Sequence, residues 1–232
     1  MILPLFLALG LGQMTCRAVP GAEALIADRG LHYVFIGETH GSREEPEIVA
    51  DLACQLAASG RPIVVALEKD PDTQLAIDTY LRSDGSPAAR GGFLASLLWS
   101  RGAKYGQASR AYFDMFEHLR ELSRVYPTLE VLAFDGLPAI VGPSESANVW
   151  SNRGMAERLQ AERQIHPEAL ILVYVGSVHA RAKSADIGGE VFQTAASLLP
   201  AEERLSLRFS AEGGEAWNCQ AAGCGVVSRE VV

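Results

Sequence analysis

The fold is decided at VFIGETHG, residues 34–41, an apolar run that ends at a glycine and is followed at once by a carboxylate and an imidazole. A short run of β-branched and aromatic residues that ends in turn residues predicts a buried strand. In open α/β sheets, ligands bind beyond the carboxyl ends of such strands. Glu38 and His40 lie at this end, so we expect the chemistry of the protein to begin there.

Further apolar runs have the same form, and an ionisable residue follows each of them. They are residues 62–67 before Glu68, residues 129–134 before Asp135, and residues 169–175 before the segment 176–179, which ends in His179. Amphipathic helical patterns separate these runs, and such alternation of strands and helices predicts a parallel sheet. Because parallel strands point the same way, their carboxyl ends should meet at one edge of the sheet.

The order of the elements predicts an α/β fold, a mostly parallel sheet with helices on both faces and a small helical insertion at about residues 84–126. Helices are expected at residues 72–82, 107–126, 152–165 and 191–199, and an edge strand at residues 205–209. The chain of 232 residues suits one domain over residues 19–232, with a cysteine-containing tail at about residues 210–232.

Residues 1–18 resemble a secretory signal peptide, although no Lys or Arg follows Met1. A buried N-terminal strand or helix is the alternative. We expect export, and therefore a periplasmic or secreted protein. The apolar run is too short for a comfortable membrane span, so no integral span is expected in the mature chain. The formal net charge of -8 and the lack of a run rich in Lys and Arg argue against nucleic acid as a partner.

The four cysteines divide into two kinds. Cys16 lies within the predicted signal peptide, and Cys54 falls among apolar helical positions, where a buried free thiol is the usual outcome. Cys219 and Cys224 lie close together in a glycine-rich tail and predict a disulfide in an oxidising compartment. A metal site is less favoured there, because no further Cys or His has the spacing of zinc ligands.

The strand-end residues form a candidate site. A Gly-x-x-His pattern occurs twice, at residues 37–40 and 176–179, each time after a predicted strand. Imidazoles among carboxylates either bind a divalent metal ion or act as general base and orienting acid. The residues that could bind a metal are Glu38, His40 and His179. A strand-end carboxylate more commonly caps the following helix, and for Asp135 this alternative weighs at least as much.

The motifs at these residues resemble those of the erythromycin esterase, ChaN-like and Tiki superfamily. GETHG at residues 37–41 with Glu44 is similar to its first motif, ALE at 66–68 to its second, and VGSVHA at 175–180 to its last. The resemblance covers about residues 31–199. The chain departs from the pattern at Ser177, where Asn is common, and at residues 106–109, where exported members tend to carry Gly-Arg.

The segment NRGMA, residues 152–156, also resembles a family segment in which an Arg precedes Met-Ala at the start of a helix. This match implies that Arg153 points its guanidinium into the crevice, where a planar fork suits a carboxylate or a developing oxyanion. The family implies a parallel α/β fold and divergent activities. Members similar to erythromycin esterase open a lactone, Tiki-like members are metal-dependent proteases, and ChaN-like members bind haem at the cell envelope.

We therefore expect an exported hydrolase that acts on an ester, lactone or amide bond of a small-molecule or peptide substrate. In this hypothesis His40 or His179 activates water, and Arg153 stabilises negative charge. Glu38 and Glu68 orient the imidazoles or complete a site for a divalent metal ion.

The alternative hypothesis, which the ChaN-like resemblance implies, is a haem-binding envelope protein of iron uptake without catalysis. Tyr105, Tyr112 and Tyr174 are conceivable iron ligands, but their spacing singles out none of them.

Overall fold

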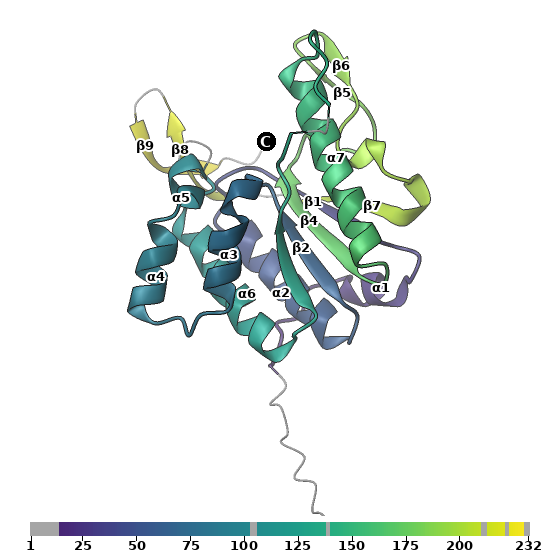
Figure 1. Cartoon of the computed structure of the whole chain (residues 1–232). Coiled ribbons are helices and arrows are strands. Elements are labelled where there is room, and N and C mark those ends of the chain that lie inside the picture. The colour runs from purple at the N-terminus through teal and green to yellow at the C-terminus, as the bar shows by residue number, and fades with distance from the viewer. Residues whose placement is uncertain (1–13, 103–105, 138–139, 210–212, 221–222, 230–232) are drawn as a thin grey trace, which may run out of the picture.

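A computed structural model of the chain describes residues 14–102, 106–137, 140–209, 213–220 and 223–229. At its centre lies a parallel sheet with the strand order β3-β2-β4-β1-β7 (Figure 1). Its strands are β1 (Tyr33–Glu38), β2 (Ile63–Leu67), β3 (Leu129–Ala133), β4 (Leu170–Gly176) and β7 (Arg204–Arg208). β1, β2 and β4 are buried along their whole length, which explains why each is a continuous apolar run in the sequence. The predicted α/β fold is confirmed.

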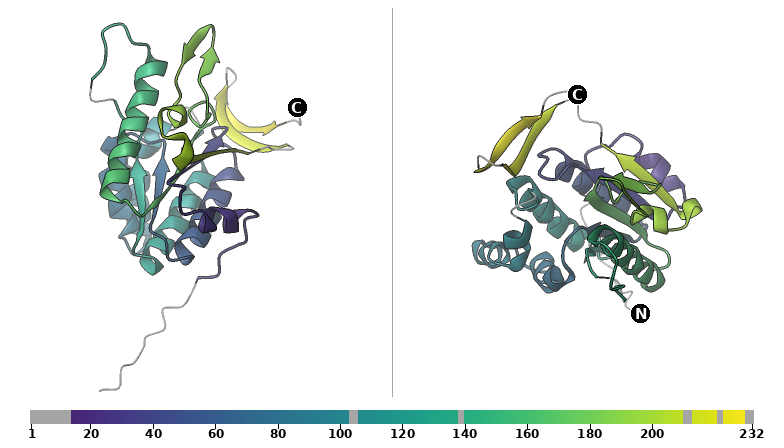
Figure 2. Two further views of the ribbon diagram at one scale, coloured as in Figure 1. Left: turned by 90° about the vertical axis from the view of Figure 1, so that its right-hand side faces the viewer. Right: turned by 90° about the horizontal axis from the view of Figure 1, so that it is seen from above.

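Helices cover both faces of this sheet (Figures 1 and 2). One face packs against α1 (Ala22–Ala27), α2 (Glu45–Ala58), α3 (Gln74–Leu81), α4 (Pro87–Leu94), α5 (Leu97–Gly102) and α6 (Arg110–Val125). The other face packs against α7 (Ala147–Ile165) and the short helix η3 (Ala196–Leu198). Alternate residues of a strand point to opposite faces. Val34 and Ile36 of β1 therefore join the first core, and Tyr33 and Phe35 join the second.

The segment predicted as a helical insertion contains α4, α5 and α6. α6 packs against α2 as part of the layer that covers the sheet. α4 packs on α3 through Phe93, whose ring stacks on that of Tyr80 with 4.1 Å between the centroids. Trp99 of α5 meets Phe93 edge-on at 5.4 Å, an arrangement that favours aromatic packing. Phe93 and Trp99 therefore belong to the core.

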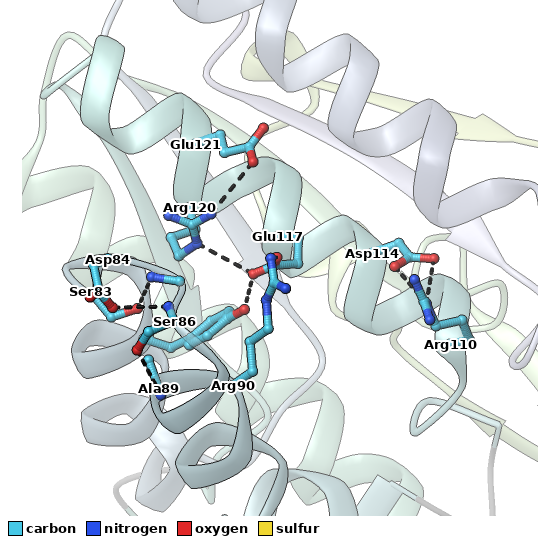
Figure 3. A network of polar contacts seen from close by, with 12 residues as sticks. Ser83, Asp84, Ser86, Ala89, Arg90, Arg110, Asp114, Glu117, Arg120 and Glu121 are labelled. Atoms are coloured by element: carbon cyan, nitrogen blue, oxygen red, sulfur yellow. Dashed lines mark hydrogen bonds and ion pairs between the residues drawn. The ribbon is translucent and has the colours of Figure 1, made fainter.

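A polar network around Glu117 links α3, α4 and α6 (Figure 3). The Tyr80 hydroxyl of α3 donates to Glu117, and Arg90 of α4 forms an ion pair with the same carboxylate. Arg120, one turn later on α6, donates from Nε to Glu117 at 3.3 Å and is itself only 5% exposed. A buried guanidinium needs a charged partner to compensate for its lost hydration, and Glu117 is that partner for Arg120. Through its three contacts, Glu117 connects α3, α4 and α6.

The predicted helix at residues 191–199 is wrong. This segment enters β6 (Glu190–Phe192), which pairs antiparallel with β5 (Ala185–Ile187), and then turns into η3. Thr194 organises the turn, because its N–H donates to Ser197 Oγ at 2.9 Å and its hydroxyl donates to the carbonyl of Arg181 at 2.6 Å. Such local bonds between side chain and backbone compete with a helix, and the apolar spacing alone did not reveal them.

The C-terminal tail forms a hairpin of β8 (Gly214–Gln220) and β9 (Gly223–Arg229), closed by the predicted disulfide between Cys219 and Cys224. β8 also pairs with the loop that follows β1. The N–H of Trp217 donates to the carbonyl of Gly41 at 2.8 Å. Gly41 has a φ of +84°, and a Cβ there would lie 2.1 Å from the carbonyl oxygen of Trp217, so only glycine fits. The hairpin thus contacts the loop that carries His40.

Met14 and Cys16 fall within the predicted signal peptide but pack against the core that includes α2, whereas residues 1–13 lie outside the described part. Cys16 forms a disulfide with Cys54, so Cys54 is not the free thiol that we expected. The N–H of Val19 donates to Gln55 Oε1 at 3.0 Å. In the described ranges, no helix combines the length and the apolar character needed to cross a membrane.

Candidate functional site

Side chains from three strand ends meet at the carboxyl edge of the sheet. Glu38 ends β1 with His40 just beyond it, Glu68 follows β2, and His179 follows β4. β4 lies between β1 and β2 in the sheet. The chain leaves β1 and β2 toward the face covered by α2 and α3, but leaves β4 toward the face covered by α7. In open α/β sheets, ligands bind where neighbouring strands lead to opposite faces, and these four side chains lie at such a point.

Glu38 orients His40. Glu38 is only 2% exposed, and its Oε1 lies 2.9 Å from His40 Nδ1. A carboxylate at Nδ1 fixes the orientation of an imidazole and leaves Nε2 available for chemistry. His40 Nε2 faces Glu68, whose Oε2 lies 3.9 Å away.

Glu68 lies between the two imidazoles. Its Oε2 accepts the N–H of Gly176 at 2.6 Å, which fixes the carboxylate against the end of β4. Its Oε1 lies 3.9 Å from His179 Nε2, the same separation as between Oε2 and His40 Nε2. Both separations exceed a direct hydrogen bond, so one carboxylate is shared by two ring nitrogens without being bonded to either.

His179 is oriented by Asn152 of α7. His179 Nδ1 lies 2.8 Å from Asn152 Oδ1, and the same oxygen accepts the N–H of Ala195 at 2.8 Å. The amide nitrogen of Asn152 donates to the carbonyl of Asn148 at 2.7 Å, so the orientation of the amide is fixed from both ends. Since Oδ1 only accepts, His179 donates from Nδ1, and the neutral ring presents its lone pair at Nε2.

The pKa values of the two imidazoles shift in opposite directions. Burial alone would lower the pKa of His40, but its hydrogen bond to Glu38 and the charge of Glu68 raise the pKa to about 9. Burial lowers the pKa of His179, and the charge of His40 acts in the same direction against the opposing effect of Asp135. Burial raises the pKa of Glu68. It acts in the same sense on Glu38, but the bond from His40 outweighs it and keeps the pKa of Glu38 below its ordinary value. At neutral pH, His40 is therefore charged and His179 neutral.

Asp135 belongs to the electrostatic environment of the site. Burial, together with the charge of Glu68, raises its pKa to about 6, against the effect of His179. It does not cap a following helix, because the next helix, α7, is capped by the side chain of Ser146. The helix-cap alternative that the sequence left open for Asp135 therefore does not apply.

Arg153 is not brought into this cluster. Its guanidinium pairs with Glu145, with 2.7 Å between Nη2 and Oε2, and also donates to the carbonyl of Ile140. Its Nε lies 3.6 Å from Glu157 on the same helix. The segment that resembles the family pattern thus contributes Asn152 to the site rather than Arg153.

Two of the candidate iron ligands are buried in the described structure. Tyr112 and Tyr174 are 1% and 0% exposed, and burial raises the pKa of both hydroxyls well above the ordinary value. Tyr105 lies outside the described residues.

Lys69, Gln107 and Asn152 belong to the site but were not among the predicted residues. Lys69 and Gln107 are 4% and 6% exposed, and Gln107 Nε2 donates to Glu38 Oε1 at 3.1 Å. A lysine directly after Glu68, at the end of a buried strand, was a signal for one of them. Nothing in the local sequence placed Gln107 beside Glu38, because the two are far apart in the chain.

The donor atoms of the cluster suit a divalent metal ion. Ligand atoms of Glu38, His40 and Glu68 all lie within 4.8 Å of one another. Glu38, however, is engaged through Oε1 by both His40 and Gln107. Nε2 of His40 and Nε2 of His179 each lie 3.9 Å from an oxygen of the Glu68 carboxylate. The group within 4.8 Å contains the predicted ligands Glu38 and His40 together with Glu68, whereas His179 lies outside it. With His179 included, two imidazoles and one carboxylate form a common ligand set for Zn²⁺ and for iron.

No known family profile and no curated protein sequence matches this chain. Among solved structures, the type III effector HopBA1 is similar, with a TM-score of 0.53 and 18% identity over 95% of this chain and 99% of that one. The C-terminal region of Pasteurella multocida toxin, described as having a thiol-protease-like catalytic triad, aligns with a TM-score of 0.46 and 12% identity over 91% of this chain and 26% of that one. The likeness to HopBA1 extends over nearly the whole of both chains and shows a shared fold.

Proposed function

We propose that this protein is a hydrolase of an ester, lactone or amide bond in which His179 is the general base and His40 the proton donor. One observation carries the proposal: both imidazoles direct Nε2 at Glu68, while their pKa values shift in opposite directions. Neighbouring groups whose pKa values are driven apart separate the base from the acid of a reaction. The proposal agrees with the erythromycin esterase and Tiki motifs that the sequence resembles.

The reaction follows from the two ring nitrogens. His179 Nε2 accepts a proton from water while the water oxygen attacks the carbonyl carbon. The positive charge of His40 stabilises the negative oxygen that develops, and its Nε2 proton passes to the leaving oxygen or nitrogen as the bond breaks. Glu38 and Asn152 hold the two rings at Nδ1, and Glu68 lies 3.9 Å from each Nε2 atom.

A divalent metal ion is an alternative use of the same residues, because an Nε2 atom that binds an ion cannot also transfer a proton. His40 and His179, through Nε2, and Glu68 would hold it, with Glu38 and Asn152 as the outer partners of the two imidazoles. When bound, such an ion supplies Lewis-acid polarisation of the carbonyl group. With or without the ion, the hydrogen bonds at Nδ1 of His40 and His179 orient the two rings.

The test uses the full chain with its disulfides intact and a panel of chromogenic esters, lactones and peptide amides. We expect His179→Ala and His40→Ala each to lower kcat/KM about a hundredfold to ten-thousandfold. His166→Ala is the control, because His166 caps α7 and contacts Glu130 and Glu162 away from the site. If both site variants hydrolyse every accepted substrate as fast as the unmodified chain, the proposal is wrong.

We also propose that the protein acts outside the cytoplasm, in the periplasm or as a secreted protein. The Cys219–Cys224 disulfide, which lies far from the predicted signal peptide, supports this location, because disulfides persist in oxidising compartments. Cell fractionation with a C-terminal epitope tag tests it. Recovery of the tag only with cytoplasmic markers would contradict it.

A further inference from the structure

We propose that Lys69 and Gln107 are positioning residues that fix the Glu38 carboxylate, and through it the ring of His40. This inference rests on the proposed function, in which His40 acts on the substrate. Lys69 follows β2, and Gln107 lies in the segment before α6, so they approach Glu38 from outside its own strand. The three side chains form one chain of contacts from Lys69 through Gln107 to Glu38.

Lys69 is buried, so contacts with its neighbours must compensate for the lost hydration of its ammonium group. Its Nζ donates to the backbone carbonyl of Gln107 at 3.2 Å and to Gln107 Oε1 at 3.1 Å. The ammonium also lies 4.2 Å from the centroid of the Tyr112 ring, within the range of a cation–π interaction. A buried cation is retained only where such contacts compensate for lost hydration. Two of these contacts are to Gln107, one to its backbone and one to its side chain.

Lys69 determines which way the Gln107 amide points. An ammonium group only donates, so the amide atom that faces Lys69 must be the oxygen. The NH₂ group of Gln107 must then face Glu38, and Nε2 donates to Oε1 at 3.1 Å. A flipped amide would place two donors against each other at Lys69 and an oxygen against a carboxylate at Glu38. Both contacts are repulsive, so the lysine selects a single orientation.

One oxygen atom, Glu38 Oε1, connects Gln107 to His40. Glu38 Oε1 accepts from both His40 Nδ1, at 2.9 Å, and Gln107 Nε2, at 3.1 Å. Gln107 Nε2 also lies 3.2 Å from His40 Nδ1, so the amide packs against the ring as well as the carboxylate. The contacts from His40 and Gln107 together restrict the rotation of the buried Glu38 carboxylate. Because this carboxylate holds His40 at Nδ1, it also sets the direction of His40 Nε2.

The test reads the His40 ring directly, by ¹⁵N-resolved NMR of its ring nitrogens in the full chain at pH 7. We expect Gln107→Leu and Lys69→Met to change the Nδ1 and Nε2 shifts of His40 and to lower kcat about tenfold to a hundredfold with little change in KM. Lys69→Arg keeps the donors and should return both readouts toward those of the unmodified chain. Lys183→Met and Gln164→Leu, at exposed positions, are the matched controls and should change neither.

The two readouts separate this inference from the proposed function. His40 shifts that change in Gln107→Leu, in a chain that hydrolyses nothing, would support the positioning role and remove the hydrolase. Unchanged His40 shifts in both Gln107→Leu and Lys69→Met would overturn the inference, whatever the activity. Gln107→Asn is the second variant if Gln107→Leu does not fold, because it keeps the amide but shortens its reach. Far-ultraviolet circular dichroism identifies the folded variants.

Discussion

The backbone of Gly176 lies directly against the imidazole of His40. A Cβ at this glycine would lie 3.0 Å from His40 Nε2 and 3.3 Å from Glu68 Oε2. β4 thus ends in a residue without a side chain so that the ring and the carboxylate can both approach its backbone. The donor N–H of Gly176 holds Glu68 from the same point, at 2.6 Å.

We predict that Gly176→Ala lowers kcat/KM about tenfold to a hundredfold while the protein stays folded, because the added methyl group displaces His40 Nε2 from Glu68. Steady-state kinetics and a thermal unfolding curve check the two parts of this prediction. Gly91→Ala in α4 is the control, since its Cβ would meet nothing within 4 Å. Full activity in Gly176→Ala would show that the position of His40 Nε2 is not critical.

The pH dependence follows from the opposite shifts of the two imidazoles. His179 becomes a competent base as pH rises through its lowered pKa, and His40 loses its proton near pH 9. A plot of log kcat/KM against pH should therefore form a bell with its alkaline limb near pH 9.

The free energy of unfolding should also depend on pH through His40. The pKa of His40 is raised from 6.5 to about 9, so its stabilising contribution is complete below pH 6.5 and is lost as pH rises through 9.

A pH series of initial rates tests this prediction, with His40→Gln as the comparison. The variant should lose the alkaline limb and keep the acidic one. Rates in the unmodified chain that continue to rise well above pH 9 would contradict the assignment of His40 as the proton donor.

Metal content distinguishes the two forms of the proposed site. If a divalent ion belongs to it, elemental analysis of the purified chain should find about one ion per chain, and His179→Ala and Glu68→Gln should each weaken its binding at least tenfold. His118→Ala, outside the cluster, should retain the ion.

Haemin titration tests the haem-binding alternative. Because Tyr112 and Tyr174 are buried, we expect no Soret shift at micromolar haemin, and a stoichiometric shift would favour the haem-binding alternative.

The convergence of the strand-end side chains could be predicted from the sequence, but the residues that support them could not. Glu38, Glu68 and His179 each follow a continuous apolar run, and parallel strands bring such ends to one edge. The position of β4 between β1 and β2 depends on the packing of whole helices. Contacts that follow from it, such as that of Gly176 with His40, therefore have no signature in the local sequence.

Two predictions were wrong because they depended on contacts that the local sequence does not show. Asn152 reaches His179 from α7, which lies on the opposite face from α2, and only the tertiary structure shows that Asn152 rather than Arg153 faces the site. The helix expected at residues 191–199 had the right apolar spacing. Its two preceding glycines, with φ values of +63° and +86°, instead form a hairpin turn.

The disulfides predict the thiol content of the purified protein. With Cys16–Cys54 and Cys219–Cys224 both formed, a thiol titration in denaturant should find no free thiol before reduction. Removal of residues 1–18 as a signal peptide would instead leave Cys54 as one free thiol. The Cys16–Cys54 bond spans a sequence separation of 38, and Cys16→Ser should lower the free energy of unfolding by about 3 to 4 kcal/mol. An unchanged unfolding curve would mean that this bond does not form.

The Glu117 network predicts a difference between two ion pairs on the same helix (Figure 3). The side chain of Glu117 is 16% exposed and that of its partner Arg120 6%, so Glu117→Gln leaves a buried guanidinium without its main charged acceptor. We expect a loss of about 2 kcal/mol in the free energy of unfolding. The side chains of Arg110 and Asp114 are 84% and 52% exposed, so Asp114→Asn should change it by no more than about 0.5 kcal/mol. Urea unfolding of the two variants measures the difference. Equal losses would show that burial of Arg120 does not control the stability of the α3, α4 and α6 layer.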